Sequence, residues 1–193
     1  MVNIVTIAGV KYLVDVGFGS FGPVEPIELR YRVTEDTPQR RVVHMANEHI
    51  PDNTHRDNPQ QLLWIYKTKP TKNLGARWIP GYCFSEVEFL PSDFEMMSFY
   101  LCYSPTSWFR WHVVASVFLW EVEYNVYGTE HDDIEGTMTI MGDEVKERRR
   151  GVSKVVKKLD NENERVQALR DYLGIELTDV QKRSILGTVS QLR

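Results

Sequence analysis

An aspartate at the end of an apolar run constrains the fold of this chain more than any other single residue. Asp15 stands in the stretch Tyr12–Ser20, YLVDVGFGS, directly after Leu13 and Val14 and just before two glycines. Strand interiors are depleted in aspartate, because its carboxylate competes for backbone hydrogen bonds and fits poorly on a half-buried pleated surface. We therefore expect a strand that ends in a carboxylate compensated by other groups.

The bulk composition narrows the class of protein. With 193 residues, of which 42% are hydrophobic and 26% charged, the chain has room for one generous globular domain or two small ones. Its net charge of −4 argues against a nucleic-acid partner. The longest uncharged apolar stretch, residues 112–120, is far shorter than a membrane span of roughly 20 residues, so we expect no membrane partner. Two cysteines give no disulfide framework, which suits a reducing cytoplasm.

The first half of the chain reads as short strands separated by turn residues. A hairpin is predicted over residues 2–14, with its turn at Ala8 and Gly9. Further strands are predicted over residues 41–45, 62–67 and 81–89. Short antiparallel strands of this kind pack as a small barrel or a sandwich, and we expect an open barrel.

The second half mixes helices and strands. A helix capped by Ser92 or Asp93 is expected to end at Tyr103, because the residue before Pro105 is disfavoured in a helix. Beyond it we expect a small α/β unit. Its predicted elements are paired strands over 113–120 and 122–127 around residue 121, a polar turn over 129–136, a hairpin over 137–149, and helices over 161–173 and 178–192.

Several motifs together resemble the arylamine N-acetyltransferases, most closely the fungal ones. They are YLVDVGFG, the segment Pro23–Leu29 ending in PIEL, EFLPSDFEMMSFY, SPTSWF and RVQALRDYLGIEL. The resemblance implies an α+β fold with an antiparallel β-barrel over residues 1–91, a linking helix and coenzyme A loop over 92–110, and an α/β lid over 111–193. It also implies that the family's N-terminal helical domain is absent from this chain.

The resemblance further implies a Cys-His-Asp triad and a two-step transfer of acetyl from acetyl-CoA to an arylamine or hydrazine nitrogen, without a metal. The neighbouring imidazole takes the proton of the thiol, and the carboxylate orients that imidazole. Asp15 matches the family's acid. Family members also contact coenzyme A at positions that match Tyr100, Thr106 and Ser107, although residue types alone favour a simple turn there.

The same likeness points to an acceptor pocket for a small aromatic amine. Phe18, Gly19 and Phe21 resemble its lining, and the glycines allow a tight backbone path. Hydrophobic packing of Phe18 is the alternative reading. The acidic run at residues 130–133 is expected to be a solvated turn rather than a metal site.

The chain departs from the family pattern at its beginning. Met1 coincides with the methionine of the family's His-Met pair, and nothing here matches its Arg-Gly-Gly-x-Cys turn. We therefore expect an N-terminally shortened chain that is inactive alone. A non-catalytic binding or heterodimerisation module, associating through the face left bare, is the alternative. A third reading makes Cys102 the nucleophile, although Cys83 and Cys102 are expected to be core or pocket-lining thiols.

Overall fold

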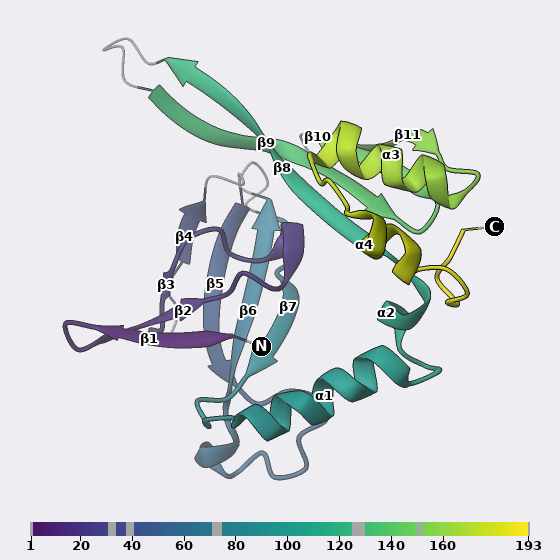
Figure 1. Cartoon of the computed structure of the whole chain (residues 1–193). Helices are drawn as coiled ribbons and strands as arrows, with labels where there is room; N and C mark the ends of the chain where they lie inside the picture. Colours follow the sequence, from purple (N-terminus) through teal and green to yellow (C-terminus); the bar gives the residue numbers. More distant parts are fainter. Residues whose placement is uncertain are drawn as a thin grey trace. The chain divides into compact units, whose positions relative to one another are not determined.

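A computed structural model describes residues 2–30, 34–37, 41–70, 75–124, 130–149 and 152–192 (Figure 1). The chain divides into two compact units. The first contains Met1–Val87 and Glu121–Ile134, and the second contains Glu88–Trp120 and Glu135–Arg193. The three-part division predicted from the sequence stays a prediction. None of the described helices is long and apolar enough to cross a membrane.

The first unit is built almost entirely from short strands. Its elements are β1 (Asn3–Ile7), β2 (Val10–Val14), η1 (Gly19–Phe21), β3 (Ile27–Glu28), β4 (Thr34–Thr37), β5 (Arg41–Glu48), η2 (Pro59–Gln61), β6 (Leu63–Pro70) and β7 (Ile79–Phe84). The predicted hairpin at Ala8 and Gly9 is confirmed as β1 and β2, because both turn residues adopt the positive φ that a tight hairpin turn requires. The strand predicted over 81–89 ends earlier, at Phe84.

Two antiparallel sheets make up this unit, one in the order β1-β2-β3 and the other in the order β4-β5-β6-β7. One apolar core lies within it, in which Met45 and Tyr66 are direct partners across β5 and β6. The buried members of that core are Leu13, Ile27, Val43, Met45, Trp64 and Tyr66. No strand pairing joins the two sheets within the described residues, so closure into a barrel stays a prediction.

The second unit contains the longer helices. Its elements are α1 (Pro91–Tyr103), α2 (Trp108–Trp111), most of β8 (Val114–Tyr124) and of β9 (Glu130–Met141), β10 (Glu144–Arg149), β11 (Val152–Lys158), α3 (Glu162–Leu173) and α4 (Asp179–Ser184). The end of β8 from residue 121 and the start of β9 up to residue 134 belong to the first unit. Its sheet has the order β11-β10-β9-β8. Its separate core contains Ile140, Val145, Leu159, Ala168 and Leu169. The helix predicted over 161–173 is confirmed, with Asn161 as its N-cap and a left-handed Gly174 after its last residue.

Three local predictions in this half are wrong. Strand β8 runs through Glu121 without a break, because no turn residue interrupts its apolar and β-branched sequence there. The polar turn expected over 129–136 is instead the start of β9 at Glu130, while residues 125–129 lie outside the described part. The last helix stops at Ser184 rather than at residue 192, since the segment after it forms separate turns and then bonds to α3 through Ser190 and Leu192.

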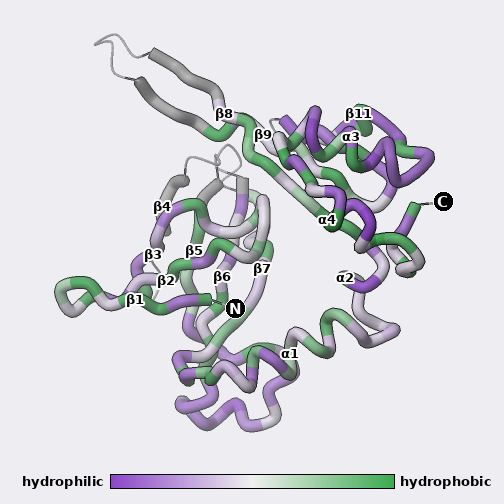
Figure 2. The backbone as a smooth tube through the Cα atoms, viewed as in Figure 1, coloured by the Kyte–Doolittle hydropathy of each residue, from purple (hydrophilic) through white to green (hydrophobic). Residues whose placement is uncertain are grey.

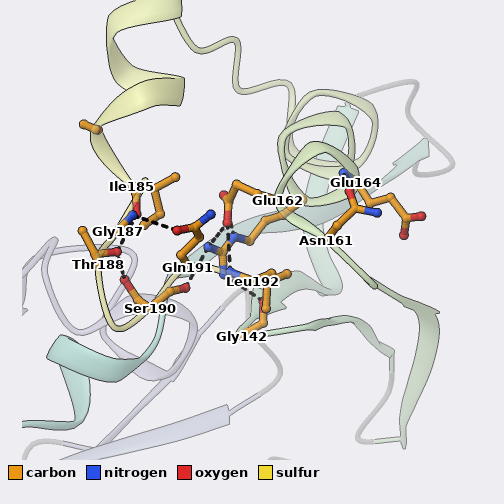
Figure 3. A network of polar contacts seen from close by, with 12 residues as sticks. Gly142, Asn161, Glu162, Glu164, Ile185, Gly187, Thr188, Ser190, Gln191 and Leu192 are labelled. Atoms are coloured by element: carbon orange, nitrogen blue, oxygen red, sulfur yellow. Dashed lines mark hydrogen bonds and ion pairs between the residues drawn. The ribbon is translucent and has the colours of Figure 1, made fainter.

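A buried arginine fastens that C-terminal segment. Arg165, on α3, is only 1% exposed, and it bonds both carboxylate oxygens of Glu162. Its guanidinium also donates to the carbonyl oxygens of Ser190, at 2.9 Å, and Gly142, at 3.4 Å. Glu162 in turn accepts the Leu192 amide at 3.2 Å. Figure 3 shows Glu162, Ser190, Leu192 and Gly142 gathered around this point, so that α3, the β9–β10 turn and the C-terminal segment share one anchor.

The helix α1 stands out because its apolar side chains are exposed. Hydrophobic positions recur along it (Figure 2), yet none of its residues is buried. Met96 is 72% exposed, Phe99 67% and Tyr103 65%. Contiguous apolar surface of this kind is unusual for a soluble monomer and commonly marks a contact region. The helix begins one or two residues before the predicted cap, and Asp93 accepts the Leu90 amide at 2.7 Å.

Candidate active site

Asp15 lies directly after β2, at the edge of the core of the first unit. Its side chain is buried, with 7% of the residue exposed, although it is charged. The amide of Gly17 donates to its Oδ1 at 2.8 Å, which is the compensation by a local backbone group that the sequence led us to expect. No lysine, arginine or histidine forms an ion pair with Asp15 in the described part of the chain. Its compensation there is therefore partial.

A tyrosine from a distant strand faces this carboxylate. The hydroxyl oxygen of Tyr82, on β7, is buried and has no hydrogen-bond partner of normal geometry among the residues described. Burial above all, and then the neighbouring Asp15 carboxylate, raise the pKa of Tyr82 well above its ordinary value. Tyr82 therefore stays protonated at any physiological pH, and its hydrogen is available to the acid.

Aromatic rings form a wall beside the acid. The Phe18 ring packs edge-on against Tyr82, with ring centroids 4.8 Å apart, and Tyr82 stacks on Tyr66 at 5.2 Å. Gly81 makes this packing possible, since a methyl group there would come within 3.1 Å of the Tyr66 ring and 3.3 Å of the Phe18 ring. Phe18 remains 42% exposed, so one side of the wall is open to a small apolar molecule.

The turn that carries Phe18 also holds the other two predicted pocket residues. Gly19 has a φ of +71°, which a residue with a Cβ rarely adopts, and it starts the short helix η1. Phe21 ends that helix and is 48% exposed, while its carbonyl oxygen accepts the Tyr66 hydroxyl at 3.2 Å. Phe18 and Phe21 thus lie in one turn anchored on β6 and β7, and their role as pocket lining stays a prediction.

The predicted coenzyme A residues lie in the second unit, with Tyr100 in the last turn of α1 and Thr106 and Ser107 in the loop between α1 and α2. Three hydroxyls meet there, since Thr106 Oγ1 lies 3.1 Å from the Tyr100 hydroxyl and 2.9 Å from Ser104 Oγ. The hydrogen bonds from Thr106 and then Ser104 lower the pKa of Tyr100. This cluster is exposed and presents both donors and acceptors, as the oxygens of pantetheine or a phosphate require.

Ser107 differs from its two predicted companions. It is 5% exposed, and its hydroxyl donates to the Leu101 carbonyl at 2.6 Å. That bond ties the loop back to the last turn of α1. The geometry therefore gives Ser107 a part in holding the loop, while its contact with coenzyme A, like those of Tyr100 and Thr106, stays a prediction.

The cysteines and His112 lie apart from Asp15 in the sequence, and the described residues show their surroundings. Cys83 and Cys102 are both exposed, so neither is a core thiol, and the alternative that they line a pocket stays a prediction. Cys83 points away from the core because it alternates with Tyr82 and Phe84 along β7. His112 follows α2, and its ring stacks on Trp108 with the ring centroids 4.8 Å apart. Within the described ranges no group of three or more His, Cys, Asp or Glu side chains converges as metal ligands do.

The sequence reading missed the groups that come from distant strands. Tyr66, Gly81 and Tyr82 complete the surroundings of Asp15, but they lie in the predicted strands as ordinary aromatic and turn residues. Alternation along β7 was the available signal, because Tyr82 and Phe84 fall on the same face of that strand. It could show that they face the core, but not that they meet Asp15.

Comparison with known proteins identifies the family. A family model described as N-acetyltransferase matches residues 1–182. The chain belongs to the arylamine N-acetyltransferase family. An N-malonyltransferase, FDB2 of the fungus Fusarium pseudograminearum, is 34% identical to this N-acetyltransferase-family chain over 189 residues, which are 96% of the chain and 53% of the relative. The chain spans about half the length of the curated relatives it matches.

Solved structures of the family share the fold. The arylamine N-acetyltransferase of Mycobacterium abscessus superposes with a TM-score of 0.72 at 19% identity, covering 97% of this chain and 58% of that one. The Mycobacterium marinum arylamine N-acetyltransferase in complex with CoA superposes with a TM-score of 0.64 at 22% identity, covering 99% and 57%. The two units described above therefore have the fold of arylamine N-acetyltransferases.

Proposed function

We propose that this chain is part of an acyl-CoA-dependent N-acyltransferase and provides the orienting acid, an aromatic acceptor wall and the acyl-CoA loop. One observation carries the proposal. The Asp15 carboxylate is buried beside an open aromatic wall with one backbone amide bonded to it and no cation paired with it in the described residues. A buried carboxylate without a cation is costly, so its position indicates a role beyond stability.

In the proposed reaction Asp15 accepts a hydrogen bond from an imidazole and holds it toward a cysteine thiol. The thiolate attacks the thioester carbonyl of acyl-CoA, and the bond from that carbonyl carbon to the coenzyme sulfur breaks. The leaving thiolate takes the proton from the imidazolium. An amine then attacks the acyl-enzyme, its proton passes to the imidazole, and the cysteine thiolate leaves. In this proposal Tyr82, protonated and facing Asp15, donates a hydrogen bond to the acid.

The acyl group and the amine are part of the proposal. The names of the fungal relatives support malonyl as the group transferred, whereas the sequence motifs led us to expect acetyl. The M. marinum enzyme was solved in complex with CoA, which supports coenzyme A as the carrier. The exposed face of Phe18, beside Tyr82, supports an acceptor with an aromatic ring, because offset and edge-on ring pairs are favourable.

The test compares two polypeptides. The 193-residue chain and the product of the complete reading frame around it are purified and given acetyl-CoA or malonyl-CoA with an aniline acceptor. We expect transfer by the longer product and none by the 193-residue chain, and a decrease on the order of 10³–10⁴ in kcat/KM when the longer product carries Asp15→Asn. A reading frame without Arg-Gly-Gly-x-Cys, or an Asp15→Asn product of normal activity, contradicts the proposal.

The exposed apolar side of α1 favours a second candidate, a module that associates with another protein. Met96, Phe99 and Tyr103 are each more than half exposed, and the exposed apolar area is of the kind found in interfaces. The mass of the 193-residue chain in solution tests this candidate. A monomer at high concentration, with Phe99→Ser no more soluble than the parent chain, contradicts it.

A further inference from the structure

We propose that Arg110 and Trp111 bind the nucleotide end of acyl-CoA, with the arginine on a phosphate and the indole under the adenine ring. This inference rests on the proposed function and adds to it a site that the sequence motifs did not point to. Both residues lie on α2, immediately after the loop whose Ser104 and Thr106 form the hydroxyl cluster with Tyr100 of α1.

Arg110 is an isolated cation with most of its donors unused. It is the one lysine or arginine between residues 88 and 120. Its Nη1 donates to the Tyr103 carbonyl at 2.9 Å, and no carboxylate of the described ranges lies within ion-pair distance of it. A guanidinium has five N–H donors in a planar fork that matches the oxygens of a phosphate. The single bond to Tyr103 fixes this fork at the end of α1 and leaves four donors for a ligand.

Trp111 is an exposed ring that is nevertheless held in place. Its indole Nε1 donates to the Pro105 carbonyl at 2.9 Å, so the ring is tied to the loop itself. The residue is 46% exposed. The guanidinium carbon of Arg110 lies 5.9 Å from the centre of this ring. A fixed aromatic face beside a cation is the arrangement that binds a nucleotide, because the base stacks while its phosphate meets the charge.

The loop before α2 has polar groups that suit the pantetheine end of the same ligand. Ser107 anchors it to Leu101, and Trp111 anchors it through Pro105, so the loop is held at both sides. Between these anchors the exposed hydroxyls present donors and acceptors to a neutral amide chain such as pantetheine. One short segment, residues 100–111, thus offers uncharged polar groups at one end and a cation with a stacking ring at the other.

A protein partner explains the same surface less well. An apolar interface over α2 would bury the Arg110 guanidinium without a carboxylate from this segment, which is costly. A phosphate removes that cost, because it brings the opposite charge with it. The charge of this segment therefore favours an anionic small molecule over an apolar protein surface.

Binding to the 193-residue chain tests the inference without any need for catalysis. Dissociation constants are measured by calorimetry for coenzyme A, 3′,5′-ADP and pantetheine. We expect coenzyme A to bind at least tenfold more tightly than pantetheine. Arg110→Ala is expected to weaken coenzyme A and 3′,5′-ADP about tenfold or more and to leave pantetheine unchanged, because charge-assisted hydrogen bonds to a phosphate are lost. Arg110→Lys, which keeps the charge, is expected to recover part of the loss.

A separate variant tests the stacking role of Trp111. Trp111→Leu is expected to weaken coenzyme A and 3′,5′-ADP about tenfold, since the base loses its platform. The matched controls are Trp120→Leu and Arg170→Ala, which change an exposed tryptophan and an exposed arginine of the same unit elsewhere. Both controls are expected to bind as the parent chain does. Unchanged pantetheine binding by each variant reports that the loop remains folded.

The outcomes separate this inference from the proposed function. Coenzyme A binding that is equal in the parent chain, Arg110→Ala and Trp111→Leu overturns the nucleotide site and leaves the proposed function standing. A chain that binds neither coenzyme A nor 3′,5′-ADP also overturns the nucleotide site. Binding of 3′,5′-ADP that depends on Arg110, together with a complete reading-frame product that transfers no acyl group, supports the site and overturns the proposed function.

Discussion

Each unit contains a buried charged residue, and the two residues differ in how many hydrogen-bond and ion-pair partners surround them. Arg165 is 1% exposed and bonds a carboxylate and two carbonyl oxygens. Asp15 is 7% exposed and bonds one backbone amide, with an unbonded tyrosine hydroxyl opposite. Within the described residues the arginine is compensated by its own unit, whereas the aspartate is not.

The difference indicates what each charge does. A buried cation with a full set of acceptors ties elements together, so its removal should be felt as lost stability. A buried acid with few partners contributes little to stability, and such groups cluster at functional sites. We therefore expect stability and activity to separate between the two residues, and four substitutions test that separation.

The largest effect on stability is expected from Arg165→Met. This change removes the cation and leaves the Glu162 carboxylate, whose side chain is 16% exposed, without its partner. We expect the free energy of unfolding to fall by about 3–5 kcal/mol. Urea denaturation measures it, and Arg170→Met on the same helix is the control. Arg170 is 66% exposed and lies 3.6 Å from Glu176, so its loss should change stability by less than about 0.5 kcal/mol. Equal losses of stability in Arg165→Met and Arg170→Met would contradict the anchoring role of the buried arginine.

Glu162→Gln is expected to have the next largest effect. The amide oxygen of glutamine can accept one bond from Arg165, while the carbonyls of Ser190 and Gly142 still accept the others. A loss of about 1.5–3 kcal/mol follows, because the ion pair becomes a bond to a neutral acceptor and the buried guanidinium loses its counter-charge. The same urea titration measures it. A loss greater than that of Arg165→Met shows that Glu162, rather than the arginine, is the centre of the anchor.

Tyr82→Phe tests the surroundings of Asp15 through the pH dependence of the free energy of unfolding. The pKa of Tyr82 is raised above its ordinary 10.0 in the folded chain. The contribution of Tyr82 to the free energy of unfolding is therefore fully present below about pH 10, and it is lost as the pH rises above that value. At pH 8 we expect a change within about 1 kcal/mol, since an unbonded hydroxyl is removed. At pH 11 the variant should gain about 1 kcal/mol relative to the parent chain, and unfolding curves that run parallel at both pH values contradict this.

Asp15→Asn is expected to change stability least. Its remaining oxygen can still accept the Gly17 amide, and its new amide group can donate to Tyr82. The free energy of unfolding should stay within about 1 kcal/mol of the parent value, in either direction, although transfer by the complete product is lost. Thermal and urea unfolding of the 193-residue chain measure it. A loss above about 2 kcal/mol would mean that the charge is well compensated in the folded chain.

Local signals made much of the fold predictable. Turn residues at Gly9 and Gly142, and the caps at Asn161 and Gly174, fixed hairpins and a helix that the structure contains. The break expected at Glu121 failed because one charged residue does not by itself end a strand whose sequence on both sides is apolar and β-branched. The last helix was overestimated because its apolar spacing continues past Ser184, where the chain instead forms separate turns and then bonds to α3 at Ser190 and Leu192.

The candidate site was predictable only in its local part. Asp15 could be found because an acid is out of place at the end of an apolar strand. Tyr82 comes from β7, and its approach to Asp15 depends on how the two sheets pack, which no local pattern encodes. Arg165 reads as an exposed helix residue for the same reason, and its burial follows from the C-terminal segment that covers it.

The β9–β10 turn has a consequence for the dynamics of the second unit. The Gly142 amide donates to the Val113 carbonyl at 3.0 Å and the Gly142 carbonyl accepts from Arg165, so one residue joins the segment just before β8 to α3. Opening either bond alone frees little, because the other still restrains the turn. The Gly142 amide hydrogen should consequently exchange with deuterium only when the whole unit opens, at a rate shared with the interior of the sheet and far below that of an ordinary hairpin tip.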